Sequence, residues 1–391
     1  MAALPEGEPV PESGALPDSA LAHVGSRGFG VYVHVPFCAS RCGYCDFNTY
    51  TASELGGADV LGYLDAVERE IKLASFVKPP PVQTVFFGGG TPTLLSSDQL
   101  GRLLEAIDSA WGLAPGAEVT TEANPESVTP SSLESLRRNG FTRISLGMQS
   151  ASPGVLAILD RKHTAGRAVA AAGEAREAGF KNINLDLIYG TPGESAEDFN
   201  ESLERAVSAG VDHISAYSLI VEDGTRLAAR IRRGELSPPD DDTAADRYLA
   251  AEARLSAAGF DWYEVSNWAT SPGSRCRHNM LYWRGGDWWG FGPGAHSHIG
   301  GVRWWNVKHP RDYAARLSAG VSPGQGREIL TPDERREEEV MLGMRLSEGL
   351  PLDGIDVRRV PAGLLETTGG RARLTLRGRL LADAVIRDLL T

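Results

Sequence analysis

Three of the four cysteines lie within eight residues, at Cys38, Cys42 and Cys45, while Cys276 stands alone far downstream. The Cys-x3-Cys-x2-Cys spacing lets one short loop wrap three thiolates around a single metal centre. A [4Fe–4S] cluster held by three cysteines leaves one iron open to an external ligand. A structural zinc site normally has four ligands, so Cys276 would have to supply the fourth. The pattern favours an open iron–sulfur cluster over zinc or over three incidental buried thiols.

Further polar residues follow short β-branched or aromatic runs, which we expect to be strands. These runs cover residues 31–35, 84–87, 118–122, 143–147, 183–188 and 213–219. The cysteine loop follows the first run, and a glycine loop (88–90, then Thr91 and Pro92) follows the second. Glu122, Gln149 and Asp186 lie at or near the ends of later runs. Because active sites form where the carboxyl ends of parallel strands meet, these features should share one face.

Amphipathic, helix-like segments separate the strands, at residues 56–76, 97–111, 130–139, 165–178 and 195–208. Alternating strands and helices imply an α/β fold with a parallel sheet and right-handed crossovers. Six such units predict a partial (β/α)6 barrel over residues 29–225. A flat, doubly wound sheet is the alternative, because periodicity alone does not separate the two.

The rest of the chain follows other patterns. Residues 1–28 mix Pro, Gly, Ser and Ala, which predicts a disordered extension. Residues 226–329 contain a helix near 243–258 and then a Trp-, Gly- and His-rich stretch (262–309), expected to be irregular and to cap the barrel mouth. Residues 330–391 predict a small helical or winged-helix-like domain. Its charges nearly cancel (11 basic, 12 acidic from Arg327 onward), which favours a structural role.

The composition is that of a globular protein: 391 residues, 42% hydrophobic and 23% charged, with a net charge of −12. The net charge disfavours a broadly basic nucleic-acid-binding surface and leaves a local basic patch open, and we expect no nucleic-acid partner. No apolar run approaches the ~20 residues of a membrane helix. No secretory signal pattern precedes the clustered thiols, so we expect a cytosolic protein with reduced cysteines.

The cysteine spacing and its flanks resemble those of the radical S-adenosylmethionine (SAM) enzymes. Tyr32-Val33-His34-Val35-Pro36-Phe37-Cys38 and Cys45-Asp46-Phe47 look like the branch that contains oxygen-independent coproporphyrinogen III oxidase and the HemW-type heme chaperones. The resemblance covers residues 30–391. It implies that SAM chelates the open iron and that an electron donor reduces the cluster, which cleaves SAM to a 5′-deoxyadenosyl radical.

The resemblance also implies the residues that hold SAM. Tyr32, Gly89 and Glu122 match a first SAM position, and a second matches Gly90, Thr91, Gln149, Arg161 and Asp186. The chemistry suits SAM, whose ammonium and hydroxyl groups favour carboxylates and whose carboxylate favours a guanidinium. A purely structural hydrogen bond for Glu122 and an ion pair of Arg161 with the adjoining Asp160 are the alternatives.

Two positions separate the members of this branch. The oxidases have a fourth cysteine where this chain has Phe47. His278-Asn279-x-x-Tyr282-Trp283 resembles the heme-binding element of the chaperones. A neutral imidazole is a good axial heme ligand, and Tyr282, Trp283, Trp288 and Trp289 offer flat apolar surface.

We therefore expect a heme chaperone that binds a [4Fe–4S] cluster, SAM and heme, with His278 as a heme ligand and hemoproteins as recipients. The alternatives are an oxidative decarboxylase of coproporphyrinogen III and a zinc-binding regulatory protein. His278 could instead satisfy a core hydrogen bond. His34, His296 and Cys276 are further heme-ligand candidates, each favoured as structural.

Overall fold

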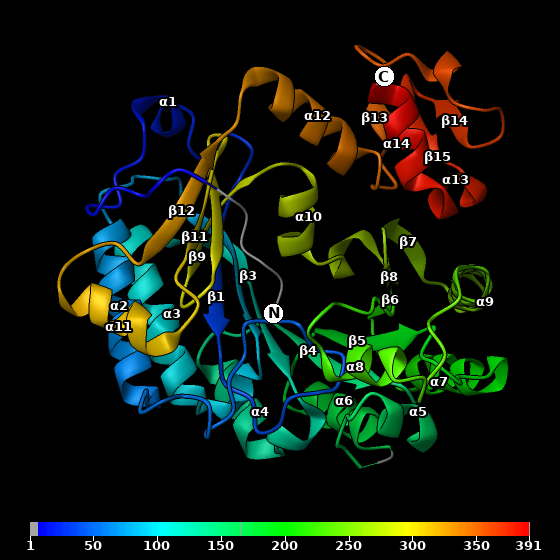
Figure 1. The fold of residues 1–391 in the computed structure, drawn as a ribbon, viewed down its shortest axis with the longest axis horizontal. Helices are drawn as coiled ribbons and strands as arrows, with labels where there is room; N and C mark the ends of the chain where they lie inside the picture. Colours follow the sequence, from blue (N-terminus) through cyan, green and yellow to red (C-terminus); the bar gives the residue numbers. More distant parts are fainter. Residues whose placement is uncertain (1–6, 165, 391) are drawn as a thin grey trace.

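The computed structural model describes residues 7–164 and 166–390. Six strands form the central part of the sheet: β1 (Phe29–Val35), β2 (Val82–Gly89), β3 (Leu113–Ala123), β4 (Arg143–Gln149), β5 (Asn182–Tyr189) and β6 (His213–Ser218). They lie side by side in sequence order and all pairs are parallel. An order without a reversal places every crossover on the same face of the sheet, unlike a doubly wound fold. The predicted partial barrel is therefore confirmed, as an open, curved sheet (Figure 1).

Helices cover the outer side of this curve (Figure 1). They are α2 (Val60–Ala74), α3 (Ser97–Trp111), α4 (Pro130–Arg138), α5 (Pro153–Ile158), α6 (Arg167–Glu177) and α7 (Ala196–Ser208), followed by α8 (Arg226–Arg232) and α9 (Asp241–Ala257). Ser96, Thr129 and Ser195 each form a capping box that fixes a helix start. Residue 165, the expected start of the 165–178 helix, lies outside the described residues.

The stretch expected to be an irregular cap instead extends the sheet at both edges. Its strands are β7 (Asp261–Glu264), β8 (Asn267–Ala269), β9 (Asp287–Phe291), β10 (His296–Ile299), β11 (Val302–Asn306) and β12 (Gly324–Ile329). The complete order is β12-β11-β10-β9-β1-β2-β3-β4-β5-β6-β8-β7. All but β9 pair antiparallel, so hairpins replace helical crossovers and the helical period disappears. The prediction of irregular structure is corrected on this point.

Two helices accompany these strands: α10 (Arg277–Trp283), which contacts β1 and β2, and α11 (Pro310–Ser318), which packs on α2. Side chains alternate along the strands. Those on the outer face, such as Val31, Val33 and Val85, pack under the helices. Those on the inner face are mainly polar or aromatic, which makes this face the place for a binding site.

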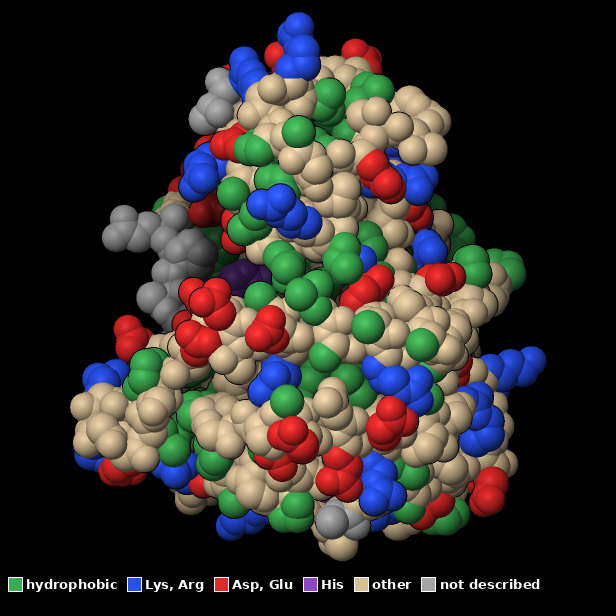
Figure 2. All heavy atoms as spheres, turned by 90° about the vertical axis from the view of Figure 1, so that its right-hand side faces the viewer, with side chains coloured by type: hydrophobic (Ala, Val, Ile, Leu, Met, Phe, Trp, Pro, Cys, Tyr) green, Lys and Arg blue, Asp and Glu red, His purple; other side chains and the backbone are tan. Residues whose placement is uncertain are grey.

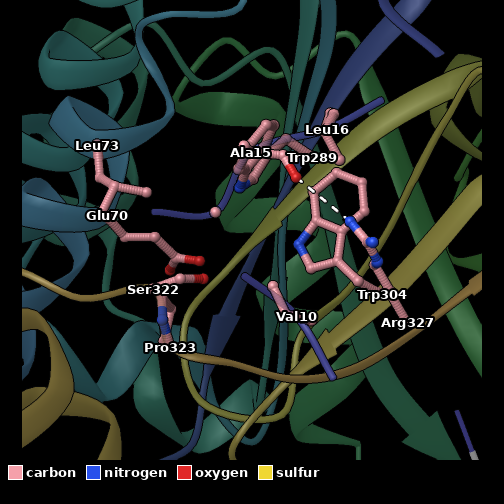
Figure 3. Close-up of a pocket in the computed structure, with 11 residues that line it drawn as sticks. Val10, Ala15, Leu16, Glu70, Leu73, Trp289, Trp304, Ser322, Pro323 and Arg327 are labelled. Atoms are coloured by element: carbon pink, nitrogen blue, oxygen red, sulfur yellow. Dashed lines mark hydrogen bonds between the residues drawn. The ribbon is translucent and has the colours of Figure 1, made fainter. Parts of the chain in front are cut away.

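The disorder expected for residues 1–28 is corrected for residues 7–28; residues 1–6 lie outside the described part. Glu8 pairs through its backbone with Arg327 of β12, and α1 (Asp18–Leu21) buries Ala20 completely. Figure 3 shows Val10, Ala15 and Leu16 beside Trp289 and Trp304 on the outer face of the sheet, where Arg327 donates to the Ala15 carbonyl. The few apolar residues of this segment hold it because they fill a hollow that distant parts of the chain create.

Residues 330–391 form a unit with its own apolar cluster. It contains α12 (Pro332–Gly343), α13 (Leu376–Leu380), α14 (Ala382–Leu390) and a three-stranded sheet of β13 (Leu350–Pro351), β15 (Arg371–Leu374) and β14 (Leu365–Thr368). It is the narrow upper part in Figure 2, where hydrophobic side chains gather between it and the broader sheet domain. Among the described residues, no helix has the length and apolar character needed to cross a bilayer.

Candidate functional site

The cysteine loop leaves β1 at the carboxyl edge of the sheet and returns toward α2. The Cys38 N–H donates to the Tyr50 carbonyl at 3.0 Å, and the Tyr50 N–H donates to Pro36 at 2.7 Å, which closes the loop at its base. All three thiols are partly exposed. Burial raises the pKa of Cys38, and raises that of Cys45 to about 11. Thiolates at these positions therefore need a metal to stabilise their charge.

The arrangement fits a cluster better than a single zinc ion. Within residues 7–164 and 166–390, no three His, Cys, Asp or Glu side chains are placed to hold one metal ion. Zinc needs every ligand about 2.3 Å or less from one point, whereas a cubane lets each thiolate bind a different iron. Cys276, the fourth ligand of the zinc alternative, instead faces Glu118 at 3.6 Å, roughly 13 Å back along β3 from Glu122.

The glycine loop after β2 is attached to the cysteine loop. The N–H groups of Gly90 and Thr91 donate to Val35 and Phe37, each at 2.8 Å. A Cβ at Gly90 would lie 2.4 Å from the Phe37 carbonyl, and one at Gly89 would lie 2.5 Å from the His34 ring. The Thr91 hydroxyl lies 4.0 Å from the Cys38 sulfur. These glycines thus allow two loops to pack against each other, and Thr91 faces the cluster ligands.

Glu122 and Asp186 lie on the inner face near the same edge. Glu122 accepts a hydrogen bond from the Gly89 N–H at 3.1 Å, and Asp186 accepts from Ser145 at 2.8 Å and from Asn184 at 2.7 Å. Burial, and then the charge of Asp186, raises the pKa of Glu122 to about 8. Burial also raises the pKa of Asp186. Two carboxyl groups with raised pKa values lie on one face, and a bound cation would stabilise their charged forms.

Arg161 and Gln149 converge above Gly147 of β4. The Arg161 guanidinium donates to the Gly147 carbonyl at 3.1 Å and lies 3.7 Å from the Cys42 sulfur, while its buried Nε has no partner among the described residues. A Cβ at Gly147 would lie 2.7 Å from Arg161 and 2.8 Å from Gln149. The expected alternative, an Arg161–Asp160 ion pair, is absent from the described residues; Asp160 pairs with Arg226 at 3.7 Å. Arg161 therefore has a donor available for an anion.

Tyr32 lies on β1, below the cysteine loop. Its hydroxyl forms a 3.0 Å hydrogen bond with Nδ1 of His34, whose Nε2 bonds to the Asn48 carbonyl at 2.9 Å. His34 thereby connects the strand to the cysteine loop, in keeping with the structural role expected of it.

A cleft of about 690 Å³ opens beside Cys42 and Cys45. Arg41, Lys162 and Arg226 line it together with the acidic residues Glu54 and Asp160. The cysteine loop can therefore be approached from outside the barrel as well as from its inner face.

His278 does not lie at this edge. It is 1% exposed, its Nδ1 forms a 2.9 Å hydrogen bond with Thr84, and its Nε2 forms a 2.8 Å hydrogen bond with Tyr282. Its ring stacks on Phe86. With both nitrogens occupied, the geometry favours the alternative of a core hydrogen-bonding histidine over a heme ligand.

Below Glu122 and Asp186, the opposite end of the barrel is closed by a polar network. Glu118 accepts from Arg143 at 3.0 Å and from the His278 N–H at 3.1 Å, and Arg143 also donates to the Ser274 carbonyl. His213 bonds to Asn184 at 2.7 Å and to Tyr263 at 2.6 Å. This network was not expected from sequence.

The structure thus brings eleven predicted residues to one edge or the inner face beside it: Tyr32, Cys38, Cys42, Cys45, Gly89, Gly90, Thr91, Glu122, Gln149, Arg161 and Asp186. Sequence reasoning missed Gly147. A glycine inside a strand run commonly marks a close approach of other groups, which was the available signal.

Comparison with known proteins gives three findings. The Radical SAM superfamily model matches residues 32–206. Proteins named heme chaperone HemW are 56% identical over 95% of this chain and 97% of the relative in Mycobacterium tuberculosis, and 34% identical over 90% and 97% in Bacillus subtilis. Coproporphyrinogen III oxidase from Escherichia coli, a radical SAM enzyme, has a TM-score of 0.80 over 95% of this chain and 92% of its own, at 24% identity, which shows the fold alone.

A curved parallel sheet with a three-cysteine loop at its carboxyl edge defines a radical SAM protein. Within that superfamily, the chain belongs to the HemW family.

Proposed function

We propose that this protein is a heme chaperone that carries a [4Fe–4S] cluster, binds SAM and heme, and delivers heme to recipient hemoproteins. The observation that carries the first part is the convergence of three partly exposed thiols with Glu122, Asp186 and Arg161 at one edge of the sheet. The name of relatives that match nearly the whole chain supports the second part. A cytosolic location remains a prediction.

The inner edge offers complementary groups for SAM. Cys38, Cys42 and Cys45 would hold the cluster, whose open iron supplies reducing power and a chelation point. Glu122 accepts hydrogen bonds and suits the ammonium of SAM. Arg161 has an unpartnered buried Nε–H for a carboxylate, and Asp186 accepts from hydroxyl groups. Gly89, Gly90 and Thr91 let the glycine loop pack against the cysteine loop. Tyr32 and Gln149 are the remaining residues proposed to contact SAM at this edge.

An electron donor is the partner that this chemistry requires. The cleft beside Cys42 and Cys45 supports a docking approach from outside, because it reaches two cluster ligands without crossing the SAM edge.

Phe47 favours a chaperone over the runner-up, an oxygen-independent coproporphyrinogen III oxidase. It stands where the oxidases have a fourth cysteine, and it is 59% exposed. The shared fold with the oxidase keeps this alternative open to test.

One experiment separates the two functions. The protein is reconstituted anaerobically with iron and sulfide, and one half receives coproporphyrinogen III, SAM and a reductant. The other half is loaded with heme and mixed with an apo-hemoprotein. We expect heme transfer without formation of protoporphyrinogen. Clear turnover of coproporphyrinogen, or heme that stays bound or never binds, would contradict the chaperone proposal.

A further inference from the structure

Five histidines lie on the inner face of the sheet or on α10 beside it, and the rings of four of them already form hydrogen bonds. Both ring nitrogens of His34, His213 and His278 are hydrogen-bonded. His298 is buried and bonds to the Gly286 carbonyl. The fifth, His296, is exposed, and neither of its ring nitrogens has a hydrogen-bond partner within the described chain.

His296 begins β10 and lies in an aromatic surface. Its ring stacks on Trp305 of β11 at 5.9 Å, with 28° between the planes. The Trp288 indole N–H donates to the His296 carbonyl at 3.0 Å, and the Trp288 ring lies 4.5 Å from that of Tyr282. Tyr282, Trp288, Phe86 and Tyr32 are all partly exposed.

Two groups of rings lie on the inner face. His296 and Trp305 stack on each other, and the second group runs from Trp288 through Tyr282, His278 and Phe86 to Tyr32, each ring beside the next. The hydrogen bond from the Trp288 indole to the His296 backbone carbonyl joins the two groups. Figure 2 shows the molecule hollowed between the C-terminal unit and the sheet domain, with hydrophobic side chains around the hollow and a histidine inside it. A flat, apolar ligand with one coordinating metal suits such a surface.

The backbone fixes the position of His296. A Cβ at Gly290 would lie 2.1 Å from the His296 carbonyl oxygen, so only glycine allows β10 to approach β9 here. Gly290 in turn pairs with Tyr32 of β1. His296 of β10 is therefore held two strands away from Tyr32 of β1, with Gly290 of β9 between them, on the face that carries Glu122.

The surrounding charges suit heme as well. Partial desolvation of the ring by its neighbours, and then the cations Lys308 and Arg303, lowers the pKa of His296, which keeps its imidazole neutral and its lone pair available.

We propose that His296 is an axial ligand of the heme, with the partly exposed Trp288 ring as an apolar surface beside the porphyrin. This inference rests on the proposed heme-binding function and replaces His278, whose nitrogens are already occupied. The exposed His296 ring stacks on Trp305 and makes no side-chain hydrogen bond within the described chain, so we expect its removal to leave the fold intact.

The test is a ferric heme titration of the full-length protein, reconstituted anaerobically, in the wild type and in His296→Ala, His278→Ala and His23→Ala. His23 is an exposed histidine in the N-terminal segment and serves as the matched control. Difference spectra against heme-free protein remove the absorbance of the cluster. Losing a second-shell partner costs a metal site 10–100-fold, so losing a ligand should weaken heme binding at least roughly tenfold.

We expect His296→Ala to shift the Soret band and weaken binding, His23→Ala to match the wild type, and added imidazole to restore the wild-type spectrum of His296→Ala. A wild-type spectrum and affinity in His296→Ala would overturn the inference while the chaperone proposal stands, as would loss of the wild-type spectrum in His278→Ala alone with unchanged iron and sulfide content. Absence of heme binding by the wild type would overturn both.

Discussion

Glu118 and Glu122 lie four residues apart on β3 and face the same side of the sheet, yet their surroundings differ. Glu118, at the closed end of the barrel, accepts hydrogen bonds from Arg143 and from the His278 N–H and faces the Cys276 thiol. Glu122, at the open edge, accepts from the Gly89 N–H and faces Asp186, which raises its pKa after burial has done so. Glu118 is thus paired with an arginine, whereas Glu122 has no cation beside it among the described residues.

The same contrast separates the two ends of the barrel as a whole. The closed end gives both ring nitrogens of His213 and His278 a hydrogen-bond partner and pairs Arg143 with Glu118, although Nη1 of Arg143 has no partner among the described residues. The open edge leaves thiols, two carboxylates and a guanidinium Nε available. Burying polar groups without partners costs free energy, so such groups persist where a ligand supplies the missing partner. The thiols and the two carboxylates with raised pKa values therefore distinguish the open edge from the closed end.

The cysteines give the largest expected effect. Alanine at Cys38, Cys42 or Cys45 should abolish iron and sulfide binding, because the cluster then has only two protein ligands. Cys276→Ala should keep full iron and sulfide content, since Cys276 is buried at the closed end beside Glu118. Anaerobic metal and sulfide analysis of the four variants checks this. Equal loss in Cys276→Ala would erase the distinction between the two ends.

The closed end should respond through stability. Glu118→Gln leaves the 1% exposed Arg143 without its counter-charge, and breaking a buried ion pair in this way costs about 3–5 kcal/mol. Glu204→Gln is the matched control, because the Glu204–Arg254 pair is exposed and exposed ion pairs contribute little to stability. Urea unfolding measures both. A similar small change in the two variants would show that the closed end does not depend on its network.

The open edge should respond through ligand binding. Glu122→Gln removes the carboxyl group that ionises when the ammonium of SAM binds beside it, and a charge-assisted hydrogen bond is worth about 1.5–3 kcal/mol, or roughly 10–100-fold in affinity. Calorimetry with SAM on reconstituted protein measures this, with the exposed Glu105→Gln as the control. Unchanged affinity in Glu122→Gln would return Glu122 to a structural role.

Sequence reasoning reached the open edge and missed the closed end for a physical reason. Strand ends, loop glycines and clustered cysteines are local signals, and six in-order βα units place them together. His278 carried a local signal too, but its partner Thr84 lies 194 residues away, and no local pattern shows that its nitrogens are occupied. The strands within 262–309 were missed because they are three to five residues long and take their partners from hairpins and from β1 and β6.

The smallest expected effect is a pH dependence that separates Glu122 from the rest of the protein. Its folded-state pKa is raised from an ordinary 4.5 to about 8. Between these values the folded protein retains a proton that the unfolded chain has lost, so this contribution to stability falls as the pH rises through the window and is flat above it.

Glu122→Gln removes this pH dependence of the free energy of unfolding. Without SAM, the variant should gain roughly 1–2 kcal/mol over the wild type between about pH 5 and about pH 8, because solvent at the partly exposed carboxyl screens part of the shift. Urea midpoints at both pH values give the difference, in which the titrations of Asp186 and of the buried Glu70 largely cancel. A constant gap between variant and wild type would mean that Glu122 is already ionised in the folded protein, and that the open edge meets its charge as fully as the closed end does.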